Sequence, residues 1–349
     1  MQTTGWITWV IIALWYEKAG LILSAKVAPM RTPALLAGLL AAAASPATAE
    51  TIYVSNERAN TISVIDAATL APIATWPVGR RPRGILLSRD GTQLYVCASD
   101  ENAVQVVDLK TGKVVADLPS GEDPETFALS PDGKLLFASN ERDATVTAID
   151  VEKRAVAFQV VVGVEPEGMA VSPDGRFAVS TSETDNAIHW IDIATRRAVG
   201  ETATEMRPRH AEFTADGRQL WVSAELGNVV QVIDAGTRKV IDTIRFTVPG
   251  IPPEKVMPVQ IRFTPDARRA VIALGRGNAI AIVDVATRKV EAVVPVGPRV
   301  WGVAISPDGK RAVAANGLAD TISVVDLATA RQVATVPVGR APWGVVVAR

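Results

Sequence analysis

One column of aspartates recurs along the chain at an almost constant spacing, and this repeat constrains the fold more than any other feature. Successive aspartates are 42 residues apart at every step except one of 50. A glycine column, with Ala267 in one place, has the same step and the same excess of eight residues. The aspartates are Asp66, Asp108, Asp150, Asp192, Asp234, Asp284 and Asp326. A period of about 40–45 residues is typical of propeller blades, so the sequence predicts seven blades.

Each unit contains four short runs of Val, Ile, Ala and aromatic residues separated by Gly, Pro and Asp, which is the pattern of strands and turns. Residues 168–172, 94–97, 61–66 and 333–338 are examples of the first to fourth runs. Pro-Asp-Gly turns join the first and second strands. Asp-x-x-Thr turns, in which the aspartate accepts backbone N–H groups, join the third and fourth. We expect these recurrent residues to be architectural and not catalytic.

The two ends of the repeat region complete each other. Residues 51–55 have the pattern of a second strand, and residues 344–348 have the pattern of a first strand. One blade is therefore expected to combine three N-terminal strands with one C-terminal strand, which hides an open sheet edge. The predicted fold is an all-β, seven-bladed β-propeller with four antiparallel strands per blade, formed as one domain by residues 50–349.

The first 49 residues have the composition of a leader. Residues 30–49 resemble a signal peptide, with Arg31, an apolar run over 34–44 and Ala47-Thr-Ala49 before the expected cleavage after Ala49. Residues 1–29 are either an upstream translation artefact or a true extension, and their apolar run over 6–16 is too short to span a bilayer. We expect export to the periplasm and a mature chain without a membrane span.

Composition excludes several classes of function. The chain has 36 Lys and Arg against 37 Asp and Glu, which argues against a nucleic-acid-binding surface. The two histidines, His189 and His210, are too few for a three-histidine metal centre. Cys97 is the single cysteine, so no intramolecular disulfide can form, and its apolar strand predicts a buried thiol. A monomer is expected.

The units resemble YVTN-type β-propeller repeats. The resemblance rests on Tyr53-Val-Ser-Asn56, on the run 60–66 and on Pro-Val-Gly at 77–79, a pattern that recurs over 51–349. The order Arg-Pro-Arg-Gly (81–84), Tyr-Val-Cys-Ala-Ser (95–99), Val-Glu-Pro-Glu-Gly (164–168) and Pro-Trp-Gly (342–344) is similar to the β-propeller family associated with PQQ-dependent catabolism. This resemblance implies an exported protein that accompanies quinoprotein alcohol oxidation, with a quinoprotein dehydrogenase as a partner.

The loops between second and third strands and those between units share one face, here called the top face; the recurrent turns form the bottom face. The variable residues of the top-face loops are expected to surround the mouth of the propeller's central channel. The residue after the proline of each inter-unit loop is Arg83, Glu125, Glu167, Arg209, Val259, Trp301 or Trp343. The next position is usually glycine, but His210 and Gln260 occupy it in two units.

Two interpretations of this mouth are open. In the first, Arg83 and Arg209 bind a carboxylate while Trp301 and Trp343 stack on a flat ring, as would suit an amphiphilic ligand or a quinone. In the second, the Arg and Glu side chains neutralise one another and the tryptophans fill the channel. The ligand-binding candidates are Arg83, Glu125, Glu167, Arg209, His210, Gln260, Trp301 and Trp343.

A divalent metal site is a further possibility, because carboxylates and an imidazole suit hard cations or transition metals. Its candidate ligands are Glu57, Glu141, Glu183, Glu225 and His210, with Glu167 as another carboxylate beside His210. Two interpretations remain: a haem group held by His210 alone, and a face that docks a partner protein. We expect a binding or accessory protein that uses the top face, with no assigned catalytic residue; the alternative is a metal-assisted, lactonase-like hydrolase.

Overall fold

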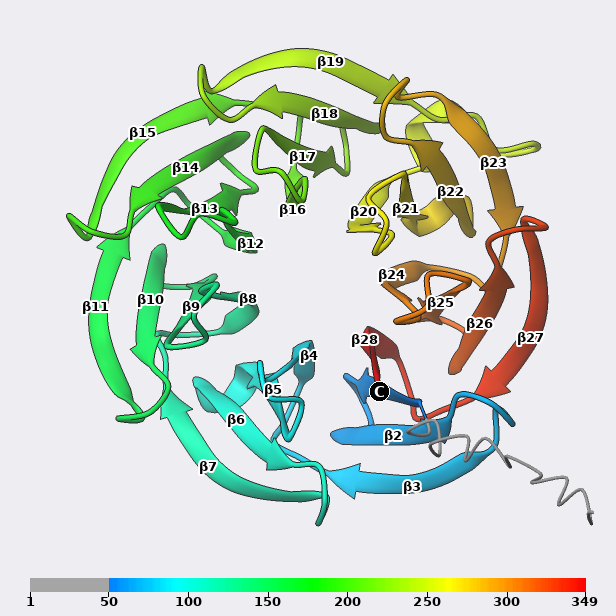
Figure 1. Ribbon diagram of the computed structural model, residues 1–349, viewed down its shortest axis with the longest axis horizontal. Helices are drawn as coiled ribbons and strands as arrows, with labels where there is room; N and C mark the ends of the chain where they lie inside the picture. Colours follow the sequence, from blue (N-terminus) through cyan, green and yellow to red (C-terminus); the bar gives the residue numbers. More distant parts are fainter. Residues whose placement is uncertain (1–49) are drawn as a thin grey trace, which may run out of the picture. The chain divides into compact units, whose positions relative to one another are not determined.

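The computed structural model describes residues 50–349, so the predictions for the leader lie outside the described residues. These residues form seven four-stranded antiparallel sheets arranged in a ring (Figure 1). The seven-bladed propeller predicted from the repeat is confirmed. No helix in this part of the chain is long and apolar enough to cross a bilayer.

Each blade is named here by its strands from the channel outward. Blade 1 contains β28 (Pro342–Ala348), β1 (Thr51–Asn56), β2 (Thr61–Asp66) and β3 (Pro72–Pro77), and blade 2 contains β4 (Pro82–Leu87), β5 (Gln93–Ala98), β6 (Ala103–Asp108) and β7 (Lys113–Pro119). Blade 3 contains β8 (Pro124–Leu129), β9 (Leu135–Asn140), β10 (Thr145–Asp150) and β11 (Ala155–Val161). Blade 4 contains β12 (Pro166–Val171), β13 (Phe177–Ser182), β14 (Ala187–Asp192) and β15 (Arg197–Ala203).

Blades 5 to 7 follow the same order. Blade 5 contains β16 (Pro208–Phe213), β17 (Gln219–Ala224), β18 (Val229–Asp234) and β19 (Lys239–Arg245). Blade 6 contains β20 (Pro258–Phe263), β21 (Arg269–Leu274), β22 (Ala279–Asp284) and β23 (Val290–Pro295). Blade 7 contains β24 (Val300–Ile305), β25 (Arg311–Asn316), β26 (Thr321–Asp326) and β27 (Arg331–Pro337). Three 3-10 turns, η1 (Ser99–Glu101), η2 (Pro253–Lys255) and η3 (Gly275–Gly277), lie in top-face loops.

The closing blade has the predicted composition. The C-terminal strand β28 is its innermost strand and pairs antiparallel with β1, with Ile52 opposite Val347. The side-chain hydroxyl of Ser55 adds a link across blades, because it donates to the carbonyl of Arg83 at 2.6 Å. The ring is therefore held shut by strand pairing between the two ends of the described chain.

The bottom-face turns follow the predicted chemistry. Asp66 accepts hydrogen bonds from the backbone N–H of Thr69 at 2.7 Å and from its hydroxyl at 2.9 Å. Five other blades repeat this arrangement, and Lys153 replaces the threonine beside Asp150. The glycines of the Pro-Asp-Gly turns have positive φ angles, and Ala267 adopts φ 57° in the same place. The turns are thus architectural, as expected.

The innermost strands differ from the prediction in where they begin. In six blades they start at the proline, two residues before the predicted start at the glycine position, and β24 starts at the equivalent Val300. Their register shifts just after this first residue, as from Pro82 to Ile85. This irregularity, a bulge, turns the residue after the proline out of the regular ladder. The bulge brings Arg83 and its equivalents in the other blades to the top of the channel.

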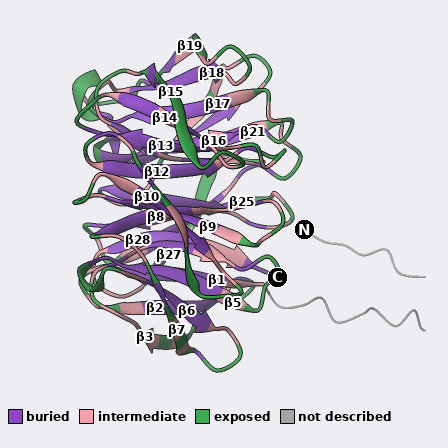
Figure 2. Ribbon diagram, turned by 90° about the vertical axis from the view of Figure 1, so that its left-hand side faces the viewer, coloured by how far each residue is buried: buried purple, intermediate pink, exposed green. Residues whose placement is uncertain are grey.

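The apolar core lies between neighbouring blades, and Figure 2 shows the buried strands in purple beneath exposed green loops. Trp190 and Trp221 are its largest fully buried side chains, and Cys97 is buried as predicted. The eight extra residues of the longer repeat lie in the loop between β19 and β20. This loop is anchored to the core through Val248 and Val256, which pack with residues of β21 and β22.

Candidate functional site

The innermost strands approach one another very closely where a glycine follows the inter-unit loop, which is the case in four of the seven blades. A Cβ atom added at Gly168 would lie 2.6 Å from the carbonyl oxygen of Arg209, and one at Gly302 would lie 2.5 Å from that of Trp343. Such contacts are too short for any side chain. The glycines are therefore required by packing and line the channel with backbone.

His210 and Gln260 occupy this position in blades 5 and 6 and bridge to the next blade instead. The Nδ1 atom of His210 accepts the backbone N–H of Ile261 at 3.4 Å. The Oε1 atom of Gln260 accepts the backbone N–H of Val303 at 2.7 Å. Both predicted site residues thus link innermost strands, and both also line the channel.

The predicted mouth residues form a layer of ion pairs, here called the charged layer. Its carboxyl groups outnumber its guanidinium groups, and most of these side chains are largely buried. The carboxyl groups belong to Glu57, Asp123, Glu125, Glu141, Glu167, Glu183 and Glu225, and the guanidinium groups to Arg81, Arg83, Arg142, Arg207, Arg209 and Arg299. This mutual pairing matches the second interpretation of the sequence.

Arg209 is the centre of one half of the charged layer. Its Nη2 atom lies 3.0 Å from Glu167, and its Nη1 atom donates to Glu183. Arg207 lies beside it, with its Nε atom 2.7 Å from Glu183 and 3.4 Å from Glu225. Because Arg209 and these three carboxylates are buried, Arg209 neutralises charges that water reaches poorly, whereas Arg207 is 43% exposed.

Arg81 and Arg83 form the other half. Arg81 pairs with Asp123 and, at 2.6 Å, with Glu125. Arg83 donates to Glu57 at 2.9 Å and also to Glu125. Arg83 and Arg209 are therefore both occupied by protein carboxylates.

The two tryptophans stack on each other and on arginines. The ring centroids of Trp301 and Trp343 are 6.4 Å apart with an interplanar angle of 20°. The guanidinium carbon of Arg299 lies 3.8 Å from the Trp301 centroid, and that of Arg209 lies 5.4 Å from it. This cation–π contact joins the apolar and charged parts of the layer.

Three carboxyl groups of the layer have raised pKa values, and at Asp123 the main cause is burial. Burial raises the pKa of Glu167 well above its ordinary value, although Arg209 opposes the shift. Burial, together with a hydrogen bond to Glu125 and the charge of that carboxylate, raises the pKa of Glu141 to about 7. The raised pKa values favour the neutral forms of these groups in a layer that has more carboxyl than guanidinium groups.

The raised pKa of Glu141 predicts a pH-dependent stability. Its folded-state pKa of about 7 exceeds the ordinary 4.5, so the folded protein loses stability as the pH rises between these values. Glu141→Gln imitates the protonated form. We expect it to stabilise the protein by about 2 kcal/mol at pH 8, or about 4–8 °C in Tm, and to have little effect at pH 4.

Glu122→Gln is the matched control for this experiment because Glu122 is exposed in the same blade. We expect its Tm to follow that of the unmodified protein at both pH values. Equal stabilisation by Glu141→Gln at pH 4 and pH 8 would show that protonation of Glu141 does not carry the effect.

The predicted metal ligands do not converge. In the described part of the chain, the one group of three metal-ligating side chains within 4.8 Å is Asp123, Glu125 and Glu141, which contains a single predicted ligand. The Arg81 guanidinium already lies among these carboxylates. His210 faces the other way, with Glu212 as its nearest acidic neighbour at 3.9 Å. A metal site built from Glu57, Glu141, Glu183, Glu225 and His210 stays a prediction.

A cavity of about 590 Å³ fills the channel beneath the charged layer. Its lining runs down the innermost strands from Gly84, His210 and Gln260 to Pro173 and Pro265 in the bottom-face turns. Among residues 50–349, no carboxyl or guanidinium group of the charged layer lines it, but the neighbouring Trp343 does. The cavity therefore lies below the predicted mouth and faces the bottom of the ring.

One wall of this cavity is polar. Arg262 donates through Nη1 to the carboxylate of Glu212, and the same nitrogen lies 3.1 Å from Nε2 of His210. Burial, reinforced by the Arg262 charge, lowers the pKa of His210 well below its ordinary value. Burial also raises the pKa of Glu212, although Arg262 opposes the shift. His210 is therefore neutral beside an ion pair.

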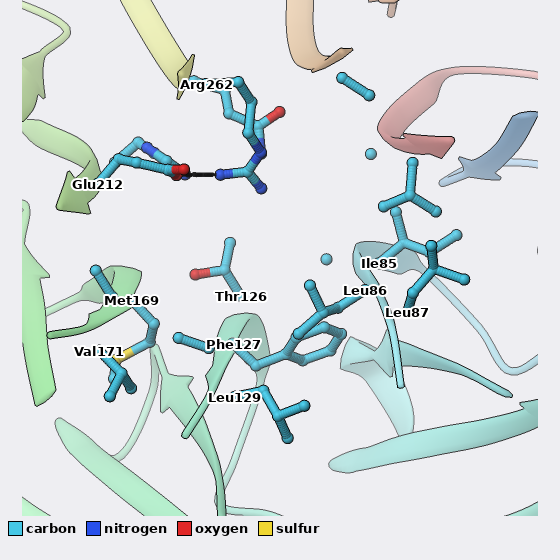
Figure 3. Close-up of a pocket in the computed structure, with 18 of the residues that line it drawn as sticks. Ile85, Leu86, Leu87, Thr126, Phe127, Leu129, Met169, Val171, Glu212 and Arg262 are labelled. Carbon is cyan, nitrogen blue, oxygen red and sulfur yellow. Dashed lines mark hydrogen bonds and ion pairs between the residues drawn. The ribbon is translucent and has the colours of Figure 1, made fainter. Parts of the chain in front are cut away.

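The rest of the lining is largely apolar. Figure 3 shows Phe127 and Leu129 across the cavity from the Glu212 and Arg262 pair, and Met169 and Val171 on the wall next to Glu212. The predicted site residues do not include this pair. The sequence does distinguish the pair, because Glu212 and Arg262 are charged where the other blades have an apolar residue. These apolar residues are Leu86, Ala128, Ala170, Ala304 and Val346.

The fold and this channel define the chain as a seven-bladed β-propeller protein. Three propeller family models match parts of it: a YNCE-like beta-propeller over residues 25–127, a cytochrome D1 heme domain over 96–195, and a 7-bladed beta-propeller lactonase over 169–335. These matches place the chain among the β-propeller proteins. No curated protein sequence matches it significantly.

Solved structures share the fold at low sequence identity. Hydrazine synthase of Kuenenia stuttgartiensis has a TM-score of 0.67 and 23% identity over 76% of this chain and 89% of that chain. A functionally unknown protein from Desulfotomaculum acetoxidans DSM 771 has a TM-score of 0.74 and 13% identity over 86% and 99%. The dihydro-heme d1 dehydrogenase NirN, in complex with DHE, has a TM-score of 0.64 and 18% identity over 84% and 74%.

Proposed function

We propose that this chain is a binding protein that holds a small amphiphilic molecule in its central channel. The observation that carries the proposal is the cavity of about 590 Å³, in which a polar wall and apolar side chains share one lining. Ligand pockets typically have volumes of about 300–1,000 Å³ and combine apolar side chains with polar groups that orient the ligand. The channel has a volume in this range, and polar and apolar atoms contribute about equally to its exposed lining.

The setting that we propose is an accessory role beside a quinoprotein dehydrogenase in the periplasm. The resemblance to proteins of PQQ-dependent catabolism and the signal-peptide pattern support this role. The top face also offers a docking surface, because its loops expose Val164, Met206, Leu226 and Leu318 by 50%, 55%, 41% and 68%. Exposed large apolar side chains favour protein contact. A partner on the top face would leave the bottom of the channel open to the ligand.

Filling the channel tests the binding function. Val171 lines the cavity, so Val171→Trp places an indole in the ligand volume. In native mass spectrometry of periplasmic protein, we expect a small-molecule adduct on the unmodified chain and its loss in this variant. Val333→Trp is the control, because Val333 is 55% exposed on the outer strand β27. The proposal would be contradicted if no adduct were found on the unmodified chain or on either variant. It would also be contradicted by an adduct that persists in Val171→Trp.

The second candidate is a metal-assisted, lactonase-like hydrolase, favoured by the lactonase model that matches residues 169–335. This range contains His210, Glu183 and Glu225 from the predicted metal set. Elemental analysis of the same samples separates the two functions. A stoichiometric divalent metal that persists in Val171→Trp and is lost in Glu183→Gln would favour the hydrolase.

A further inference from the structure

We infer that the channel selects an apolar monocarboxylate, with its carboxylate bound by Arg262 and its apolar body packed against Phe127, Met169 and Val171. The inference rests on the proposed function and names the class of ligand. It depends on the unused donors of Arg262, on the charge balance of the lining and on the position of Arg89.

Arg262 keeps most of its hydrogen-bonding capacity for a ligand. Its contacts with Glu212, His210 and the carbonyl of Ile261 all use Nη1. Its Nε and Nη2 groups donate to no described residue, and the side chain is 29% exposed in a position that lines the cavity. Two neighbouring N–H groups of one guanidinium form a fork that matches the two oxygens of a carboxylate.

The charges of the lining favour a single negative charge on the ligand. The charged side chains that line the cavity are Arg89, Arg262 and Glu212, while His210 beside them is neutral. Glu212 offsets one arginine, so one positive charge is left to be balanced. A ligand carboxylate balances it; a cation would add to it.

The apolar part of the ligand has a matching surface. Phe127 faces the Arg262 and Glu212 pair across the cavity, and Met169 and Val171 line the wall next to Glu212 (Figure 3). A ligand whose carboxylate contacts Arg262 would therefore place its body against these side chains. Each apolar group transferred from water to this wall adds to the binding free energy.

Arg89 marks the route by which the ligand reaches the channel. It lies in the bottom-face turn of blade 2, at the position that Pro131, Pro173 and Pro265 occupy in other blades, and it is exposed. An exposed arginine at the open end of a channel attracts anions before they bind inside. The ligand is thus expected to arrive from the bottom face, away from the charged layer.

A series of three probes with one ring system tests the inference. 2-Naphthaleneacetate, 2-naphthaleneethanol and 2-naphthaleneethylamine differ mainly in charge, and their binding to the mature protein is measured by calorimetry at pH 8. We expect the acetate to bind at least about tenfold more tightly than the alcohol, since hydrogen bonds to charged groups are stronger, and the amine to bind most weakly. Equal or tighter binding of the alcohol or amine would overturn the inference.

Two variants locate the preference at the ion pair. Glu212→Gln removes the opposing charge and is expected to tighten acetate binding several-fold without changing alcohol binding. The double variant Glu212→Gln with Arg262→Gln keeps a hydrogen-bonded pair without charge and should make acetate and alcohol bind equally. An acetate preference that survives the double variant would refute the role of Arg262. Failure of all three probes to bind the unmodified protein would instead refute the proposed function.

Discussion

Replacement of Arg209 by methionine is expected to lower the stability of the propeller by about 3–5 kcal/mol, which corresponds to a fall in Tm of roughly 10 °C. Arg209 is 7% exposed and pairs with Glu167 at 3.0 Å and with Glu183. Its removal leaves the buried Glu167 without an ion-pair partner and leaves Glu183 with Arg207 alone. Methionine retains the apolar stem, so the loss reports the charge more than the packing.

Arg207→Met is the matched control for this measurement. Arg207 contacts Glu183 at 2.7 Å, but its side chain is 43% exposed. Water therefore screens the pair, and we expect a loss below about 1 kcal/mol. Thermal unfolding of both variants at pH 7 gives the comparison. Equal losses in the two variants would show that burial of the charged layer does not determine its energetics.

Removal of strand β28 is expected to have the second large effect. A chain that ends at Arg340 lacks the innermost strand of blade 1, which pairs with β1 along its length. The edge of β1 would be open, and Trp343 would no longer stack on Trp301. We expect this chain to lose cooperative thermal unfolding and to aggregate, because unpaired edge strands associate readily.

Deletion of Arg349 alone is the control for the truncation, since this exposed residue follows β28. It should unfold like the complete chain. If the chain that ends at Arg340 also unfolded cooperatively at an unchanged Tm, closure of the ring by the two ends would not stabilise this propeller.

The repeat predicted most of the architecture because each blade solves the same packing problem. The Asp66 column, the Pro-Asp-Gly turns and the closing blade all follow from local turn chemistry and spacing. The early start of the innermost strands was missed. Nothing in the letters Pro-Arg-Gly distinguishes a loop from a bulged strand whose register shifts between Pro82 and Ile85.

The candidate site was harder to predict because it depends on which side chains meet. The mouth residues were found, but their pairing depends on geometry: Arg83 could reach a ligand or Glu57, and the structure places it 2.9 Å from Glu57. Arg81 and Arg299 were missed because they come before the inter-unit proline or its equivalent, whereas only the residues after it were compared between the blades. Glu212 and Arg262 were missed because the comparison stopped two residues earlier on their strands.

The most direct test of the central claim is a crystal structure with 6-bromo-2-naphthaleneacetate, in which the anomalous signal of bromine locates the ring. We predict a bromine peak in the channel near Phe127, Met169 and Val171, with carboxylate density within hydrogen-bond distance of Arg262. A channel without such density in crystals of a complex that binds the compound in solution, or a peak confined to the top face, would contradict the account.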